Sequence, residues 1–125
     1  MIVRNFDDLA GTDRDVAWGN GQSVRFLLEQ DATPYTVTHT TVRAGSESHL
    51  CYEQHAETCY CITGDGEVVI GDETHALSTG VLYSLRPGEA HRLRAFSDLH
   101  LVCVFSPPLK GPERHVLDHA GHSSY

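Results

Sequence analysis

The sequence alternates between short stretches rich in β-branched and aromatic residues and turn-forming residues that recur at close, even intervals. Many short strands at such spacing are typical of an all-β sandwich or small barrel. A parallel α/β fold would need crossover helices, and no long stretch shows a good helical period. The strands that we predict cover residues 23–29, 35–43, 57–63, 67–70, 73–77, 81–85, 91–95 and 99–106.

The length and the charge of the chain narrow the class of protein further. A chain of 125 residues suits one domain with one core. Its formal net charge of -8 at pH 7 argues against partners that are nucleic acids or anionic membranes. No apolar run approaches the roughly 20 residues of a membrane span, and the N-terminus lacks the apolar segment of a signal peptide. We therefore expect a cytoplasmic protein whose four cysteines are reduced thiols.

Strand alternation predicts which side chains face the interior, because residues of one parity share a side. In the strand 91–95, Arg92 and Arg94 should face water, so His91 should face inward. If the more apolar face of each of the other strands also faces the interior, the inward-facing residues include Glu57, Tyr83, His91, Cys103 and Phe105. A carboxylate within an apolar run must be paired, protonated or bound to a metal. The predicted interior therefore contains three possible metal ligands, a carboxylate, a phenol and an imidazole.

Two motif fragments resemble the two conserved segments of the cupin superfamily. They are Gly45-x3-His49-x-Cys51-x3-His55-x-Glu57-x6-Gly64 and Arg86-Pro87-Gly88-x2-His91. The resemblance implies an all-β, single-domain cupin, a double-stranded β-helix or jelly-roll-like barrel. The barrel would cover residues from about 20 to 106, and the short polar C-terminal tail, 107–125, would act as a lid. One departure is Cys51, which stands where the usual motif has a histidine.

Within the superfamily, the chain is similar to the ectoine synthase family over almost its full length. The specific segments are Tyr60-Cys61-Ile62-x-Gly64-x-Gly66-Glu67 and Leu101-Val102-Cys103-Val104-Phe105-x-Pro107-Pro108-Leu109. The resemblance implies a hydro-lyase that cyclises N-gamma-acetyl-L-2,4-diaminobutyrate to ectoine with loss of water. It also implies a homodimer and iron (Fe2+) held as a Lewis acid by Glu57, Tyr83 and His91.

The resemblance also implies roles for other residues of this chain. The resemblance implies catalytic roles for Tyr52, Glu113 and His115, and substrate binding by Arg25, Thr40, Cys103 and Phe105. Two departures concern the substrate: Gly21 stands where the family usually has a tryptophan, and Thr38 replaces an asparagine. Trp18 either takes over the missing tryptophan's contact from a shifted loop or leaves it lost. Two alternatives remain open, an iron-dependent cupin dioxygenase and a metal-free cupin that binds a small molecule.

Overall fold

The computed structural model describes residues 1–115 and 123–125 and shows short strands with very little helix. The helical elements are one α-helical turn, α1 (Phe6–Leu9), and one 3-10 turn (Glu29–Asp31). The strands in chain order are β1 (Asp15–Ala17), β2 (Gly21–Leu27), β3 (Thr36–Val42), β4 (Glu47–Cys51), β5 (Ala56–Thr63), β6 (Gly66–Ile70), β7 (Glu73–Leu77), β8 (Leu82–Leu85), β9 (His91–Ala95), β10 (Leu99–Ser106) and β11 (Ser123–Ser124).

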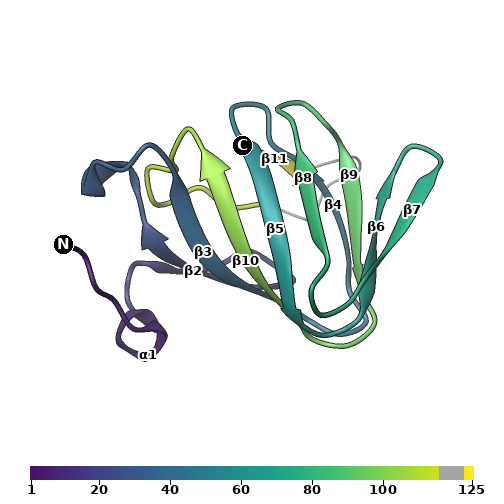
Figure 1. The fold of residues 1–125 in the computed structure, drawn as a ribbon, viewed down its shortest axis with the longest axis horizontal. Coiled ribbons are helices and arrows are strands. Elements are labelled where there is room, and N and C mark those ends of the chain that lie inside the picture. The colour runs from purple at the N-terminus through teal and green to yellow at the C-terminus, as the bar shows by residue number, and fades with distance from the viewer. Residues whose placement is uncertain (116–122) are drawn as a thin grey trace.

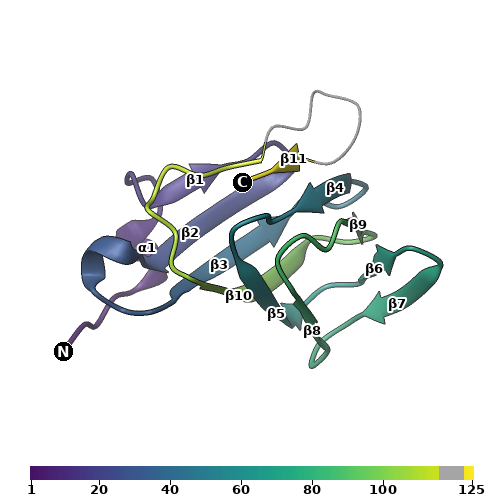
Figure 2. The same ribbon diagram turned by 90° about the horizontal axis from the view of Figure 1, so that it is seen from above.

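The strands form two sheets that enclose one interior (Figures 1 and 2). The order in the larger sheet is β1-β2-β3-β10-β5-β8, and in the smaller sheet it is β11-β4-β9-β6-β7. Neighbouring strands are antiparallel, apart from β11, which pairs with β4 in parallel. The prediction of an all-β architecture without crossover helices is confirmed. In the part of the chain that the structure describes, no helix is long and apolar enough to cross a membrane.

The predicted strands match observed ones, while three observed strands were missed. The predictions at 73–77, 91–95 and 99–106 have the observed bounds, and the others differ by one or two residues at one or both ends. The missed strands are β1, β4 and β11, which are short or polar. The sequence also indicates one helical turn near residues 113–119. No helix forms at 113–115, and residues 116–119 lie outside the described residues.

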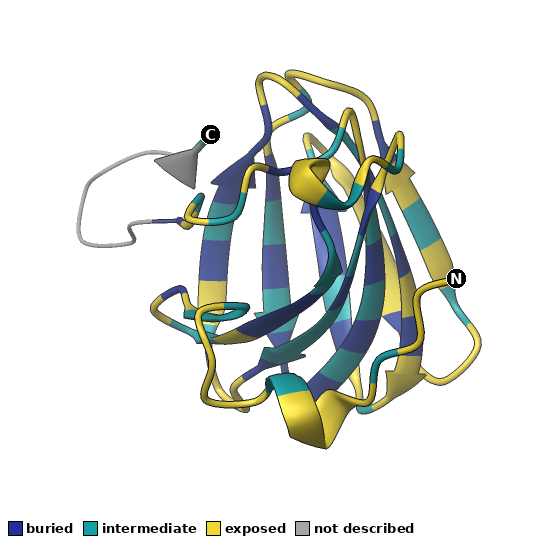
Figure 3. Cartoon of the chain, turned by 90° about the vertical axis from the view of Figure 1, so that its left-hand side faces the viewer, coloured by how far each residue is buried: buried dark blue, intermediate teal, exposed yellow. Residues whose placement is uncertain are grey.

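The core follows the strand alternation, which appears in Figure 3 as bands of buried and less buried positions. Along β9 and β10 every second residue is buried. The predicted inward residues Glu57, His91, Cys103 and Phe105 are buried, and Tyr83 is half-buried. The single interior therefore contains ionisable groups as well as apolar ones.

The first residues after β10 belong to the core, although the sequence suggested a polar tail there. Leu109 has no exposed surface. Its N–H donates to Thr36 Oγ1 and its carbonyl accepts from Glu29 N–H, both at 2.8 Å. This segment is therefore fixed against the barrel, and only residues beyond it could act as a lid.

Candidate functional site

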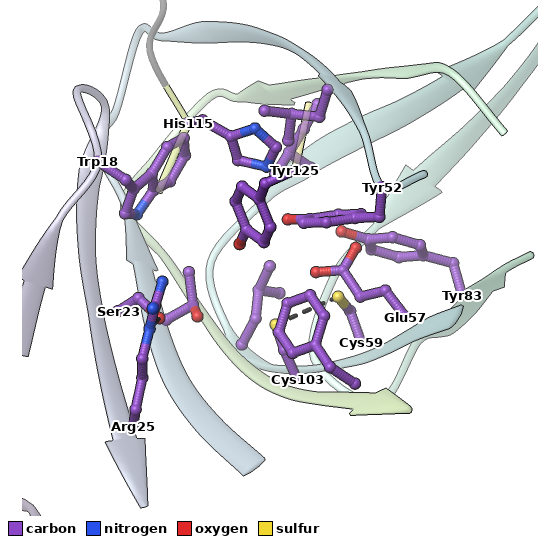
Figure 4. Close-up of a pocket in the computed structure, with 15 residues that line it drawn as sticks. Trp18, Ser23, Arg25, Tyr52, Glu57, Cys59, Tyr83, Cys103, His115 and Tyr125 are labelled. Atoms are coloured by element: carbon purple, nitrogen blue, oxygen red, sulfur yellow. Dashed lines mark hydrogen bonds between the residues drawn. The ribbon is translucent and has the colours of Figure 1, made fainter. Parts of the chain in front are cut away.

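A cavity lies between the two sheets and is closed on one side by residues of the tail (Figure 4). Its lining combines apolar, aromatic, charged and thiol side chains. The lining residues are Trp18, Ser23, Arg25, Thr40, Leu50, Tyr52, Glu57, Cys59, Tyr83, Leu93, Leu101, Cys103, Phe105, His115 and Tyr125. Of the predicted site residues, only His91 and Glu113 are missing from this set.

Glu57 lies deep in the cavity, on β5 between β10 and β8. Its partners across these strands are Phe105 and Leu85, and its residue surface is only 4% exposed. Burial raises the pKa of the carboxyl group to about 7, although hydrogen bonds with Cys59 and Tyr52 act in the opposite direction. The cavity therefore contains a carboxyl group that is partly protonated near neutral pH.

Two thiols and a phenol surround this carboxylate. Cys59 stands opposite Cys103 on β10 and opposite Tyr83 on β8. The two sulfur atoms are 3.2 Å apart, and a carboxylate oxygen of Glu57 and both sulfurs lie within 4.8 Å of one another. Burial raises the pKa of Cys59 and of Tyr83 well above their ordinary values. The group therefore offers oxygen and sulfur donors within one part of the cavity wall.

His91 lies beside the cavity and does not line it. The side chain is buried on β9, and its Nδ1 is 3.1 Å from the carbonyl oxygen of Glu89. Its ring centroid is 6.2 Å from that of Tyr52, which does line the cavity. Strand alternation thus predicted the burial of His91, but not which side chains surround its ring.

An aromatic cluster closes the cavity on the side of the tail. The ring centroid of His115 is 4.9 Å from that of Tyr52 and 4.6 Å from that of Tyr125. Tyr125 also accepts a hydrogen bond at its carbonyl from Glu53 N–H, beside the pairing of β11 with β4. Sequence reasoning missed Tyr125, because a single residue beyond the strands has no periodicity to assign it a side.

Trp18 reaches the cavity from the loop before β2. Its ring centroid is 6.4 Å from that of His115, and it borders the cavity near Ser23 and Arg25 (Figure 4). The indole Nε1 is buried and has no hydrogen-bond acceptor among the described residues. Trp18 therefore lines the cavity, whereas Gly21 carries no side chain that could do so.

Arg25 connects the barrel to the tail. The guanidinium is buried, and its Nη1 donates to the carbonyl of Gly111 at 2.6 Å while Nη2 donates to the carbonyl of Glu113. The Glu113 carboxylate accepts from the N–H groups of Lys110 and Gly111, both at 2.8 Å. Glu113 therefore shapes the tail outside the cavity, and Arg25 holds the tail in place.

The other two predicted contact residues lie on neighbouring strands of the larger sheet, Thr40 on β3 and Phe105 on β10. The Thr40 hydroxyl is 2.8 Å from that of Thr38, which occupies the position of the family's asparagine. The ring of Phe105 packs edge to face on Tyr52, with centroids 5.1 Å apart. Together they provide one polar and one apolar surface for a small molecule.

Comparison with known proteins finds a matching family model and similar sequences. A family model described as ectoine synthase matches residues 1–124. The L-ectoine synthase of Hahella chejuensis is 44% identical over 117 residues, which are 92% of this chain and 89% of that protein. The chain belongs to the ectoine synthase family. The resemblance seen in the motifs is thereby confirmed, and the family is one of enzymes.

Solved structures agree with this assignment. The ectoine synthase from P. lautus has a TM-score of 0.86 and 38% identity, covering 89% of this chain and 81% of that chain. The cupin domain of Schizosaccharomyces pombe Cnp3, at 12% identity, has a TM-score of 0.63 and covers 74% of this chain and 64% of that chain. The second likeness concerns the fold alone, and it agrees with the predicted cupin barrel.

Proposed function

We propose that this chain cyclises N-gamma-acetyl-L-2,4-diaminobutyrate to ectoine with loss of water. The observation that carries the proposal is the buried Glu57 carboxylate in a cavity that also contains most of the predicted substrate-binding residues. Membership of the ectoine synthase family supports the same reaction. The substrate would be a small N-acetylated diamino acid, which suits an enclosed cavity with few charged groups.

We propose that iron (Fe2+) is held by Glu57, Tyr83 and His91. The donor set fits a divalent first-row metal, because it combines carboxylate, phenol and imidazole groups. Glu57 and Tyr83 line the cavity together, and the His91 ring lies beside Tyr52 at its edge. Lewis-acid polarisation of the amide oxygen is the chemistry that this metal supplies when bound.

The walls of the cavity would bind and fold the substrate. Phe105 offers an apolar surface to the carbon chain, and the unsatisfied Nε1–H of Trp18 offers a hydrogen bond to a substrate oxygen. Arg25 provides positive charge for the carboxylate, while Thr40 and Cys103 complete the contacts. Holding the amine close to the amide carbon replaces part of the entropic barrier to ring closure.

The aromatic cluster would exclude water and move protons. We assign to His115 the removal of a proton from the substrate ammonium, because its ring borders the cavity beside Tyr52. Burial raises the pKa of Tyr52 well above its ordinary value, so its hydroxyl stays protonated and serves as a donor to the departing oxygen. Glu113 acts by ordering the tail segment that carries His115.

We also propose a cytoplasmic homodimer, as the family resemblance implies. Exposed apolar side chains on the outer face of β5 and β8, among them Ile62 and Leu82, offer a surface for a second copy. Sedimentation of the purified chain at several concentrations would measure its mass. A monomer at all concentrations would contradict the dimer without affecting the proposed reaction.

The reaction is tested by incubating the iron-loaded protein with N-gamma-acetyl-L-2,4-diaminobutyrate without oxygen. We expect one ectoine for each substrate consumed, detected by a mass decrease of one water. A requirement for oxygen would favour the dioxygenase alternative, and substrate bound but unchanged would favour a binding cupin. Either result would overturn the proposal.

A matched pair of variants tests the role of Tyr83. Tyr83→Phe removes the donor oxygen and keeps the ring, so we expect the cyclisation rate to fall at least about tenfold. Tyr35→Phe makes the same chemical change at an exposed residue before β3, and it should leave the rate unchanged. Equal rates in both variants would remove Tyr83 from the metal site.

A further inference from the structure

The cavity between the two sheets is almost filled by the chain's own side chains. Its open volume is only about 30 Å³. Such a volume suits about one or two water molecules, whereas cavities that hold small organic molecules usually measure about 300–1,000 Å³. A substrate of the proposed class therefore needs space that one of the lining side chains fills.

The side chain of Tyr125 projects into this cavity, with its hydroxyl pointing inward (Figure 4). Its ring centroid lies 5.0 Å from that of Tyr52 and 4.6 Å from that of His115. Its hydroxyl shares a hydrogen bond with the Tyr52 side chain and lies close enough to Arg25 to interact with the positive charge. Tyr125 therefore contacts the same three side chains to which the proposed function assigns the polar groups of the substrate.

The attachment of Tyr125 to the rest of the molecule is small. The strand β11 pairs with β4 through only two residues, Ser123 and Ser124, and the carbonyl of Tyr125 accepts one hydrogen bond of 3.1 Å from Glu53 N–H. Short elements with so few contacts open at a low cost in free energy. Burial raises the pKa of the Tyr125 hydroxyl, so this group is neutral and its departure breaks no buried ion pair.

Other walls of the cavity are held more firmly. Phe105 and Cys103 lie within β10, which pairs with β3 on one side and with β5 on the other. His115 follows the segment whose carbonyls, at Gly111 and Glu113, accept hydrogen bonds from the Arg25 side chain. Tyr125 can therefore leave the cavity with less disturbance of the fold than these residues.

We propose that Tyr125 is an autoinhibitory residue, which closes the cavity and which the substrate displaces when it binds. The inference rests on the proposed function for the identity of the substrate. A ligand that binds only the open molecules has its apparent dissociation constant divided by the open fraction. Minor states of this kind make up about 0.1–10% of the molecules, so Tyr125 weakens apparent binding at least about tenfold.

The closure is tested by quenching the fluorescence of Trp18 with acrylamide, a small neutral amide. Trp18 is the single tryptophan of the chain, lines the cavity and is 5% exposed. We expect Tyr125→Ala to raise the quenching constant, because the cavity then opens to solvent. Tyr125→Phe keeps the ring and should retain the low value, as should Tyr35→Ala at an exposed position outside the cavity.

Equal quenching in Tyr125→Ala and in the unmodified protein would overturn the proposal. Circular dichroism checks that each variant is folded. If Tyr125→Ala does not fold, Tyr125→Leu gives the same comparison with a shorter apolar side chain.

The displacement is tested by the kinetics of the iron-loaded protein with N-gamma-acetyl-L-2,4-diaminobutyrate. We expect Tyr125→Ala to lower KM at least about tenfold, because no side chain competes with the substrate. An unchanged or higher KM would overturn the proposal, and a fall in kcat without a lower KM would indicate a catalytic role instead. If the unmodified protein forms no ectoine, the proposed reaction fails, and the quenching of Trp18 still decides whether Tyr125 closes the cavity.

Discussion

The carboxylates of Asp31 and Glu57 have opposite electrostatic surroundings. Asp31, at the end of the 3-10 turn, accepts hydrogen bonds from Arg4 and Arg14 and from the N–H of Leu28. These partners, the hydrogen bond from Arg4 foremost, hold the pKa of Asp31 well below its usual range. Glu57 has thiols and phenols around it instead, and burial raises its pKa to about 7.

The difference separates a carboxylate that stabilises the fold from one that is available for binding. Asp31 is charged and paired, so it connects the N-terminal segment to the barrel. A buried carboxylate without a cation reduces stability when it is ionised, and groups with such perturbed pKa values cluster at functional sites. A metal ion would provide Glu57 with the positive charge that Asp31 receives from two arginines.

The largest expected effect is on the pH dependence of stability in the metal-free protein. The folded pKa of Glu57, about 7, lies above its ordinary value of 4.5. The folded state therefore favours the protonated form, and this contribution is present below the unfolded pKa and lost as pH rises through 7. The loss amounts to up to about 3 kcal/mol.

Urea unfolding of the chelated protein between pH 4.5 and 8, beside Glu57→Gln, measures this contribution. The glutamine variant should lack it, so the two stability curves should diverge as pH rises. Parallel curves would show that Glu57 has an ordinary pKa, and the contrast with Asp31 would then disappear.

A smaller effect is expected at Arg25, the cation that lines the cavity. Its guanidinium donates to two tail carbonyls, of Gly111 and Glu113, and lysine lacks the planar fork that reaches both. We expect Arg25→Lys to lower kcat/KM at least about tenfold, equivalent to about 1.4 kcal/mol. Arg43→Lys, at an exposed position, is the control. Unchanged kinetics in Arg25→Lys would show that the two hydrogen bonds from Arg25 to the tail are not needed for turnover.

The smallest effect is expected at Asp31. Because its folded pKa is lowered, its contribution to stability is present above the unfolded pKa and lost as pH falls through the folded pKa. Allowing for partial solvent exposure, the contribution is about 1 kcal/mol at pH 7. Asp31→Asn should be less stable by that amount at neutral pH, and the difference should shrink in acid. The exposed Asp72→Asn is the control. A stability difference between Asp31→Asn and the unmodified protein that stays constant at all pH values would show that the pKa of Asp31 is not lowered in the folded state.

Strand alternation was sufficient to predict one wall of the cavity. Glu57 and Cys103 lie in regular strands, so their side follows from the parity of their apolar neighbours. The same logic correctly predicted the burial of His91. It could not predict that this side chain lies beside the cavity and not in its lining.

The other wall of the cavity could not be predicted from strand alternation. Trp18 and Tyr125 come from a loop and from the tail, where no period of two relates a residue to a side. Leu109 resembled part of a polar tail because it follows two prolines, yet it fills the core through contacts with distant residues. Such positions depend on long-range packing, which a local pattern does not contain.

The most direct test of this account is the cyclisation rate per folded molecule of Glu57→Gln, measured beside Asp31→Asn with iron present. The account predicts that Glu57→Gln loses at least about a hundredfold in rate, because the carboxylate ligand is gone. Asp31→Asn should keep the rate of the unmodified protein within about twofold, because Asp31 does not line the cavity. A Glu57→Gln variant as active as Asp31→Asn would contradict the account, since both carboxylates would then serve only the fold.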